Sequence, residues 1–203
     1  MAEANRRGIH KAERAGIAIR PLQTGADLQA FHRLHAHLRK QKYQLLAQPL
    51  AFFEAIAHHF NQINGWYPLG AYLGDRLIAA TIYLRWGDTL YYKFNASDMD
   101  TLELRANNLL VWAGLQLGKE LGCRKLDLGP SDQDQPGLIR FKRNFGAIER
   151  ELQFLQWIPS EFKPQHSSEI RQLLGQLTDL LTKADVPDQI TVQAGELLYR
   201  FFA

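Results

Sequence analysis

Two charged residues that could take part in catalysis stand on either side of a short polar loop. Asp127 lies at the end of a predicted strand, beside a loop of the kind in which binding groups are frequent. Lys142 follows Phe141 in a short predicted helix, so its stem can be buried while its ammonium group stays at the rim of a cleft. A carboxylate can accept a proton and an ammonium group can stabilise negative charge, and both are useful in group transfer. Alternatively, Lys142 is a solvated surface lysine and Asp127 is a helix cap or a surface carboxylate.

The elements that position this pair are a strand, a loop, a short helix and a second strand. In residues 125–128 apolar and polar side chains alternate, and Pro130 stops the strand because it has no N–H group to donate. Pro136 suits the first turn of a helix, and Gly146 suits its end. Residues 151–158 are predicted to form the second strand. One face of the helix carries three apolar residues that we expect in the core, Leu138, Phe141 and Phe145.

The rest of the chain is predicted to begin with a basic arm or a short helix over residues 1–15, ended by Gly16. After it come a strand, two helices, three antiparallel strands joined by two-residue turns, and a long helix. Two C-terminal helices carry apolar stripes, from Ile170 to Leu181 and from Ile190 to Phe201, which pack on the domain or on a partner. The predicted ranges before the loop are 17–19, 24–38, 49–61, 66–73, 76–86, 89–96 and 104–121.

The composition is that of a soluble globular protein that can form a full core. The chain has 203 residues, enough for one domain, and 46% of them are hydrophobic. The single cysteine, Cys123, excludes an internal disulfide, and no stretch resembles a signal peptide or a membrane-spanning helix. We therefore expect a cytoplasmic protein. Its net charge of +3 permits a polyanionic partner without requiring one.

Several other kinds of site are not indicated. His32 and His35, and likewise Glu54 and His58, have the spacing of helical metal ligands, but no cysteine or carboxylate cluster completes either pair. We therefore expect no metal. The sequence contains no nucleophile-elbow serine motif, no P-loop and no dinucleotide-binding glycine pattern.

The residues around the loop match a known signature. Asp-Leu-Gly-Pro-Ser at 127–131, followed by Gly-Leu-Ile-Arg-Phe-Lys-Arg-Asn-Phe-Gly at 137–146, resembles the D-x-G-x-S … G-L-x-x-F-K-x-x-F-G signature of FemAB-type acyltransferases. That family is a branch of the GNAT acyltransferase superfamily. Residues 7–16, 91–98 and 108–112 resemble the family's interdomain connector, fourth strand and main helix. The resemblance covers nearly the whole chain, but only the second GNAT domain of the family.

The resemblance implies an α/β fold of the GNAT type. It consists of a mixed, mainly antiparallel sheet of about six or seven strands flanked by helices. We expect residues 1–16 to be a basic arm or connector, residues 17–160 the GNAT domain, and residues 161–203 a helical extension. The predicted element order, obtained from periodicity, agrees with this fold.

The resemblance also implies an activity, the transfer of an acyl or aminoacyl group from an activated donor to an amine. The donor would be an aminoacyl-tRNA or an acyl thioester of CoA or a carrier protein, and the acceptor an amine such as a cell-wall or polysaccharide precursor. No tightly bound cofactor is expected. On this basis Lys142 and Asp127 are the candidate catalytic residues. The candidate substrate-binding residues are Phe141, Tyr91, Lys93, Ser131 and Asn108.

Two departures from the family pattern shape these expectations. FemAB proteins usually have two GNAT domains, so this chain either forms a homodimer or acts alone on a simpler acceptor. Residues 103–108 lack the glycines with which related enzymes bind the pyrophosphate of acetyl-CoA, so we expect a different donor. The alternative to an enzyme is a non-catalytic module that binds tRNA, a carrier protein or a glycan.

Overall fold

The computed structural model describes residues 1–155, 157 and 164–202 of the chain. Its centre is a five-stranded sheet with the strands in sequence order, β1 to β5. Consecutive strands from β1 to β4 are antiparallel, and β5 pairs in parallel with β4. The strands are β1 (Ile17–Pro21), β2 (Trp66–Leu73), β3 (Arg76–Trp86), β4 (Thr89–Ser97) and β5 (Lys125–Asp127).

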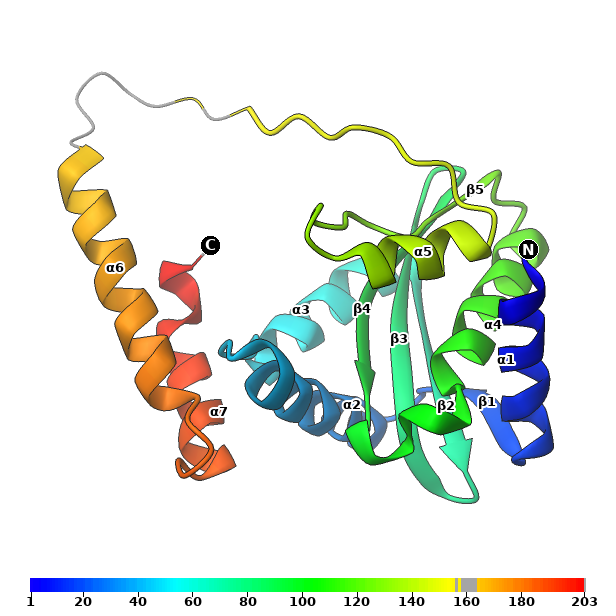
Figure 1. Ribbon diagram of the computed structural model, residues 1–203, viewed down its shortest axis with the longest axis horizontal. Helices are drawn as coiled ribbons and strands as arrows, with labels where there is room; N and C mark the ends of the chain where they lie inside the picture. Colours follow the sequence, from blue (N-terminus) through cyan, green and yellow to red (C-terminus); the bar gives the residue numbers. More distant parts are fainter. Residues whose placement is uncertain (156, 158–163, 203) are drawn as a thin grey trace.

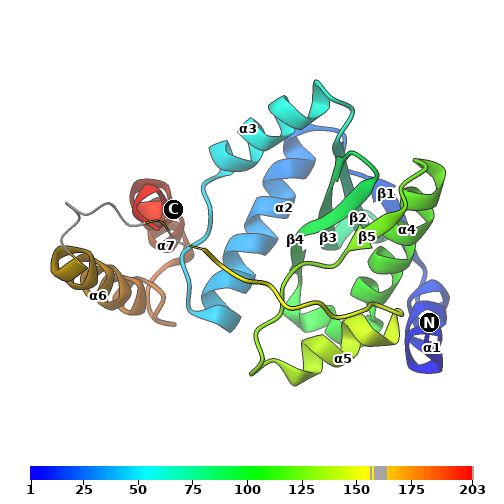
Figure 2. The same ribbon diagram turned by 90° about the horizontal axis from the view of Figure 1, so that it is seen from above.

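Helices cover both faces of the sheet and extend beyond it (Figures 1 and 2). The helices that precede β2 are α1 (Glu3–Arg14), α2 (Gly25–Leu38), the π-helix η1 (Arg39–Tyr43) and α3 (Leu50–Asn61). Those between β4 and residue 144 are the 3-10 helix η2 (Met99–Leu104), α4 (Ala106–Glu120) and α5 (Pro136–Asn144). The C-terminal helices are α6 (Pro164–Leu181), α7 (Asp188–Leu198) and the 3-10 helix η3 (Tyr199–Phe201).

Two hydrophobic clusters, one on each face of the sheet, form the core. On one face α1 and α4 pack against the sheet, and Ile9, Leu110 and Phe145 are buried there. On the other face α2 and α3 contribute Phe31 and Phe53, both fully buried. The central strand β3 is therefore covered on both sides, as its apolar sequence predicts.

The only parallel strand pair in the described part of the chain is short. β4 and β5 pair from Thr89 with Lys125 to Tyr91 with Asp127. β4 continues to Ser97, whereas β5 ends at Asp127 and the chain leaves the sheet. The two strands thus separate after Tyr91, and the loop that leads to α5 begins at this point.

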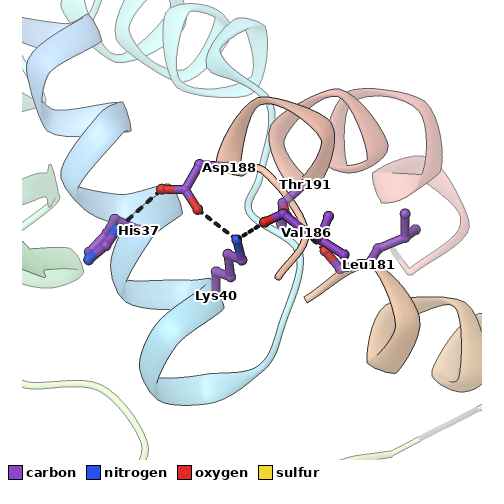
Figure 3. A network of polar contacts seen from close by, with 6 residues as sticks. All are labelled: His37, Lys40, Leu181, Val186, Asp188 and Thr191. Carbon is purple, nitrogen blue, oxygen red and sulfur yellow. Dashed lines mark hydrogen bonds and ion pairs between the residues drawn. The ribbon is translucent and has the colours of Figure 1, made fainter. Parts of the chain in front are cut away.

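The C-terminal helices dock on the side of the domain that carries α2 and η1. Lys40 in η1 is buried, and its Nζ donates to the carbonyl oxygen of Val186 and to Asp188 Oδ1, the latter at 2.7 Å. His37 Nδ1 lies 3.4 Å from the other oxygen of Asp188 (Figure 3). The ring of Tyr199 also packs edge-on against that of Phe52, with 5.5 Å between the ring centroids. α7 is therefore attached by a buried ammonium group at its first turn and by an aromatic contact just past its last turn.

The predicted order of helices and strands is confirmed as far as α5. The antiparallel meander over residues 66–96 is present, Thr24 caps α2 through a capping box, and the N-terminal basic segment is a helix rather than a free arm. The predicted long helix is divided into η2 and α4, because Arg105 between them has a left-handed backbone.

Three expectations are corrected. The sheet has five strands rather than six or seven. Residues 151–155 and 157 form no strand, and residues 156 and 158 lie outside the described part. Leu138 is 40% exposed, so the core-facing side of α5 is limited to Phe141 and Phe145. The alternating pattern after α5 lacks a partner strand, because β5 pairs over three residues only and the chain runs from α5 towards α6 (Figure 1).

Candidate functional site

A pocket of about 520 Å³ lies between α1, the N-terminus of α4, and α5. Four of the residues that line it are cationic, namely Arg7, Lys11, Arg105 and Arg140. No carboxylate lines the pocket in the described part of the chain, although Arg7 pairs with Glu3 at 2.8 Å nearby. We call it the basic pocket. Its charge favours a ligand with phosphate or other anionic groups.

The N-terminus of α4 lies at the basic pocket, to which Arg105 and Asn108 contribute. Arg105, the residue before the helix, has φ 64° and ψ 28°, the left-handed conformation that glycine adopts most easily. No side chain caps α4, so the N–H groups of Ala106 and Asn107 have no partner within the helix. The positive end of the helix dipole points the same way. Arg105 and Asn108 line the pocket, so the cations lie beside this start of the helix.

Polar contacts hold α1 as the wall of the pocket. Asn108 Nδ2 donates to Asn5 Oδ1 at 3.2 Å, and Asn5 Nδ2 donates to the carbonyl oxygen of Phe141 at 3.4 Å. Gly8 lies so close to Asn108 that an added Cβ would be 2.9 Å from its Cγ. The three helices around the pocket are thus linked through two asparagines.

Beside the pocket, Lys142 holds the loop between β5 and α5. Its Nζ donates to the carbonyl oxygens of Gly129 and Pro130, at 2.8 and 2.6 Å. Asp127 Oδ1 accepts from the N–H group of Gly129 at 2.7 Å. Burial lowers the pKa of Lys142, and the nearby Asp127 partly opposes this shift. An ammonium group has three donors, so one remains for a ligand.

Ser131 lies in the same loop. Its Oγ is buried and has no hydrogen-bond partner within the described part of the chain. A buried hydroxyl of this kind costs free energy unless a partner arrives. The loop therefore contains an unused hydroxyl group close to the two candidate catalytic residues.

Tyr91 and Lys93 lie elsewhere. They line a smaller hollow of about 310 Å³ together with Phe60, Leu84 and Trp86. Phe60 belongs to α3, so this hollow is on the sheet face that α2 and α3 cover. Both side chains share one face of β4 as predicted, but they are not among the residues that line the basic pocket.

Among the predicted site residues, Asn108 and Phe141 line the basic pocket. Asp127 at the end of β5, Ser131 in the following loop and Lys142 in α5 lie around the β5–α5 loop and are not among the lining residues. The sequence analysis did not identify the four cationic residues of the basic pocket. Arg7 and Lys11 are four residues apart in a segment that the sequence left as an arm or a helix, and only a helix places them on one face. Arg105 and Arg140 had no pattern that distinguished them from other surface arginines.

The candidate metal-ligand histidines have other partners. His32 Nε2 lies 2.9 Å from the carbonyl oxygen of Gln48, and His35 Nε2 lies 2.6 Å from its side-chain oxygen. Within the described residues no group of three or more potential ligands gathers to bind a metal ion. No helix there is long and apolar enough to cross a membrane.

Known proteins share this architecture. FemX aligns with a TM-score of 0.63 and 13% identity over 71% of this chain, and this chain spans about half, 53%, of FemX. The aminoglycoside acetyltransferase AAC(6')-Iy, solved with a bisubstrate analogue of CoA, aligns with a TM-score of 0.55 and 13% identity over 70% of this chain and 98% of its own. The acetyltransferase meta-AAC0020 from an uncultured soil metagenomic sample, solved with sisomicin, gives a TM-score of 0.55 and 16% identity over 70% of this chain and 97% of its own.

At such low identity these structures show the fold alone. No curated protein matches the sequence significantly. The family model for the acetyltransferase (GNAT) domain matches residues 3–143, which include α1, the whole sheet and nearly all of α5. The match covers more than half of the chain and all the elements that enclose the basic pocket. The chain belongs to the family of acetyltransferase (GNAT) domains.

Proposed function

We propose that the protein is an N-acyltransferase whose activated donor binds through its phosphate groups in the basic pocket. The observation that carries this proposal is that four cations line one pocket beside the start of α4, which no side chain caps. Such a helix start is suited to anion binding. Both donor classes expected from the sequence, an aminoacyl-tRNA and an acyl thioester of CoA or of a carrier protein, carry phosphates.

The reaction forms an amide bond. The amine nitrogen attacks the acyl carbon, the bond to the donor's sulfur or ester oxygen breaks, and the amine loses a proton. Negative charge develops on the acyl oxygen during the attack, so a nearby cation accelerates the step. Lys142 supplies that charge through its remaining donor, and Asp127 orients the amine or accepts its proton. Both roles agree with their places at the point where β4 and β5 separate.

The remaining candidates are assigned to binding. Phe141 and Asn108 line the pocket, and Ser131 offers a buried hydroxyl group next to it. Tyr91 and Lys93 line the hollow on the other sheet face and are proposed to contact the acceptor. For the acceptor we propose an amine of the cell-wall or polysaccharide-precursor type, reached from that side.

One observation favours a binding module as the second candidate. Lys142 and Asp127 both form hydrogen bonds with the backbone of the loop between β5 and α5. Lys142 donates to the carbonyl oxygens of Gly129 and Pro130, and Asp127 accepts from the N–H group of Gly129. If these contacts persist with ligand bound, the loop is a support for binding rather than a catalytic centre. The protein would then hold a tRNA, a carrier protein or a glycan without transferring a group.

The two candidates are separated by incubating the full chain with acetyl-CoA, longer acyl-CoAs and charged tRNAs, each with a panel of amines. An enzyme consumes one donor and yields an amide that mass spectrometry detects. We expect turnover with a donor other than plain acetyl-CoA. Tight donor binding without product supports the binding module, and no binding of any phosphate-bearing donor contradicts both candidates.

The pocket itself is tested by substitution. Arg140→Ala removes one pocket cation, and we expect donor binding to weaken about tenfold. Arg33→Ala is the matched control, because Arg33 is exposed on α2, away from the basic pocket. If Arg140→Ala and Arg33→Ala bound the donor with equal affinity, the basic pocket would not be the donor site.

A further inference from the structure

The outer helix of the C-terminal pair presents an apolar stripe that nothing in the described chain covers. Ile170, Leu173 and Leu180 in α6 are each more than half exposed, at 56%, 55% and 55%. Leu177 lies between them and is half-buried. These four residues recur at intervals of three and four, which places them on one side of the helix. We call them the outer stripe.

The outer stripe is distinct from the face with which α6 packs on α7. That inner face carries Leu174, Thr178 and Thr182, which are buried. Thr191 of α7 donates to the carbonyl oxygen of Leu181 at 2.8 Å. Figures 1 and 2 show α6 at the edge of the molecule, with α7 between it and α2. The outer stripe therefore remains free after the helical pair has docked on the domain.

We infer that the outer stripe is a homodimer interface, in which α6 packs antiparallel against α6 of a second copy. An antiparallel arrangement about the middle of the stripe places Ile170 opposite Leu180 and Leu173 opposite Leu177, with every contact made twice. This is the spacing of a helix pair that packs knobs into holes. An apolar row so arranged is complementary to itself.

The polar border of the stripe selects the same register. Glu169, Gln176 and Lys183 recur every seven residues along one side of it. In this register Glu169 and Lys183 of the second copy lie on the same side of the helix pair, offset by two residues or about 3 Å along the axis, at both ends of the stripe. Gln176 lies beside Gln176 of the second copy with the same offset. Charges beside such a seam set the choice and direction of the partner. Neither Glu169 nor Lys183 has an ion-pair partner in the described part of its own chain.

The geometry also leaves room for the second copy. The Thr182 N–H group still donates to the Thr178 carbonyl at 3.0 Å, so the helical path extends to Thr182, and Lys183 is the next residue. Because α6 is outermost, the two domains lie on opposite sides of the α6 pair. The helices that enclose the basic pocket, α1, α4 and α5, lie away from α6 (Figure 1), so a partner on α6 leaves the pocket accessible.

Sedimentation of the full chain between about 1 and 100 µM tests the interface, since short helical interfaces associate in this range. We expect a dimer that Leu173→Glu abolishes. Arg33→Ala is the surface control and leaves association unchanged. Circular dichroism verifies that each variant is folded. A monomer throughout this range, or a dimer unaffected by Leu173→Glu, would overturn the inference.

The register has its own test. Lys183→Glu alone opposes like charges at two places and weakens association about tenfold, and Glu169→Lys has the same effect. The double variant Glu169→Lys/Lys183→Glu restores wild-type association. If the double variant remains as weak as the single ones, the antiparallel register is wrong. Donor binding is expected to be the same in all of them, so this test is independent of the proposed function.

A cross-link checks the two-fold axis. In a Cys123→Ser background, Gln176→Cys places two thiols beside one another, and a short bifunctional maleimide joins them. Asp179→Cys, exposed on the same helix but off the stripe, is the matched control. Efficient linkage of the first variant and not the second is expected, and equal linkage of both would contradict the axis.

Discussion

At the scale of single residues, Lys142 has more than one task. Its two hydrogen bonds to the carbonyls of Gly129 and Pro130 fix the loop after β5, and its third donor is available for the acyl oxygen. The sequence suggested a residue whose loss would affect rate and leave stability unchanged. The contacts in the structure couple the two properties.

We therefore expect Lys142→Ala to reduce transfer by about a hundredfold and to lower the free energy of unfolding by about 1 kcal/mol. Lys142→Arg should restore little of the rate, because a planar guanidinium group does not replace a compact ammonium group between two carbonyls. Transfer assays and urea denaturation measure the two effects. Lys119→Ala, exposed near the end of α4, is the control. Full activity in Lys142→Ala would exclude the residue from the mechanism.

Arg105 combines backbone strain with a cation. Its φ of 64° is unfavourable for a residue with a Cβ, by about 1 kcal/mol relative to glycine. Arg105→Gly should therefore raise the free energy of unfolding by about this amount while weakening donor binding about tenfold. Denaturation and calorimetry measure the two quantities. Asn64→Gly is the matched control, since Asn64 also has a positive φ, 51°, but lies outside the pocket.

If Arg105→Gly left donor affinity unchanged, the guanidinium group would not contact the donor. If it lowered stability, the left-handed conformation would be supported by contacts of the arginine side chain that the glycine lacks. The first result would weaken the proposed function. The second would change only the account of why an arginine occupies this position.

At the scale of elements, the segment from α2 to α3 contains a buried neutral histidine. His35 is 5% exposed, and its ring stacks on Phe31 while its Nε2 contacts Gln48. Burial lowers the pKa of His35 from its usual 6.5 to about 4, and the nearby Arg39 and His32 act in the same direction. In the unfolded chain the ring is protonated below its ordinary pKa, whereas in the folded chain it stays neutral.

The free energy of unfolding should therefore decrease as the pH is lowered from about 6.5 to about 4, because in this window the unfolded state binds a proton that the folded state does not. Between pH 7 and pH 5 we expect a loss of about 2 kcal/mol from this residue. Urea denaturation at the two pH values measures it. His35→Phe should remove this loss, while His10→Ala, at an exposed position on α1, should not. An identical pH dependence in His35→Phe and wild type would contradict the assignment.

The attachment of α7 depends on one buried charge. Lys40 pairs with Asp188 at the first turn of this helix (Figure 3). The Lys40 side chain is 3% exposed, whereas that of Asp188 is 57% exposed. Asp188→Ala leaves the buried ammonium group without its counter-ion, which we expect to cost about 3 kcal/mol. Lys40→Met leaves only a solvated carboxylate and should cost about 1 kcal/mol. Hydrogen exchange of the α7 amides measures how much each substitution weakens the attachment of α7. A larger effect of Lys40→Met than of Asp188→Ala would contradict the view that the unpaired buried ammonium group is the main cost.

The sequence predicted the helices and strands better than it predicted which of them lie side by side. The hydrophobic period identified β2, β3, β4 and the helices, because each buries one face or both. It failed for residues 151–155 and 157, since a pattern of apolar residues states which side chains share a face but does not provide a neighbouring strand. Two residues that it named as candidates, Asn108 and Phe141, line the basic pocket, and their role in binding stays a prediction. It could not find Arg7 and Arg140, which meet only through the packing of α1 against α5.

At the scale of the whole molecule, charge is unevenly distributed. The four pocket cations come from α1, from the residue before α4 and from α5, which are distant in sequence, and Arg6 and Arg14 add further exposed charge on α1. The apolar outer stripe lies at the opposite end of the molecule (Figure 1). The protein thus has one end suited to a polyanion and one end suited to a second copy of itself. A long anionic donor can extend over α1 without meeting the dimer partner.

Salt dependence tests whether the donor is carried by a nucleic acid. A single-stranded nucleic acid that neutralises about four cations should bind with a slope of about −3 when the logarithm of the association constant is plotted against that of the salt concentration. Arg140→Ala should reduce the magnitude of this slope by about one unit, whereas Arg33→Ala should leave it unchanged. Deacylated tRNA should compete with the charged form, because the contacts are with phosphates and not with the acyl group. A slope near zero for tRNA, together with saturable binding of an acyl-CoA, would instead assign the basic pocket to the thioester donor and limit the nucleic acid to non-specific contacts.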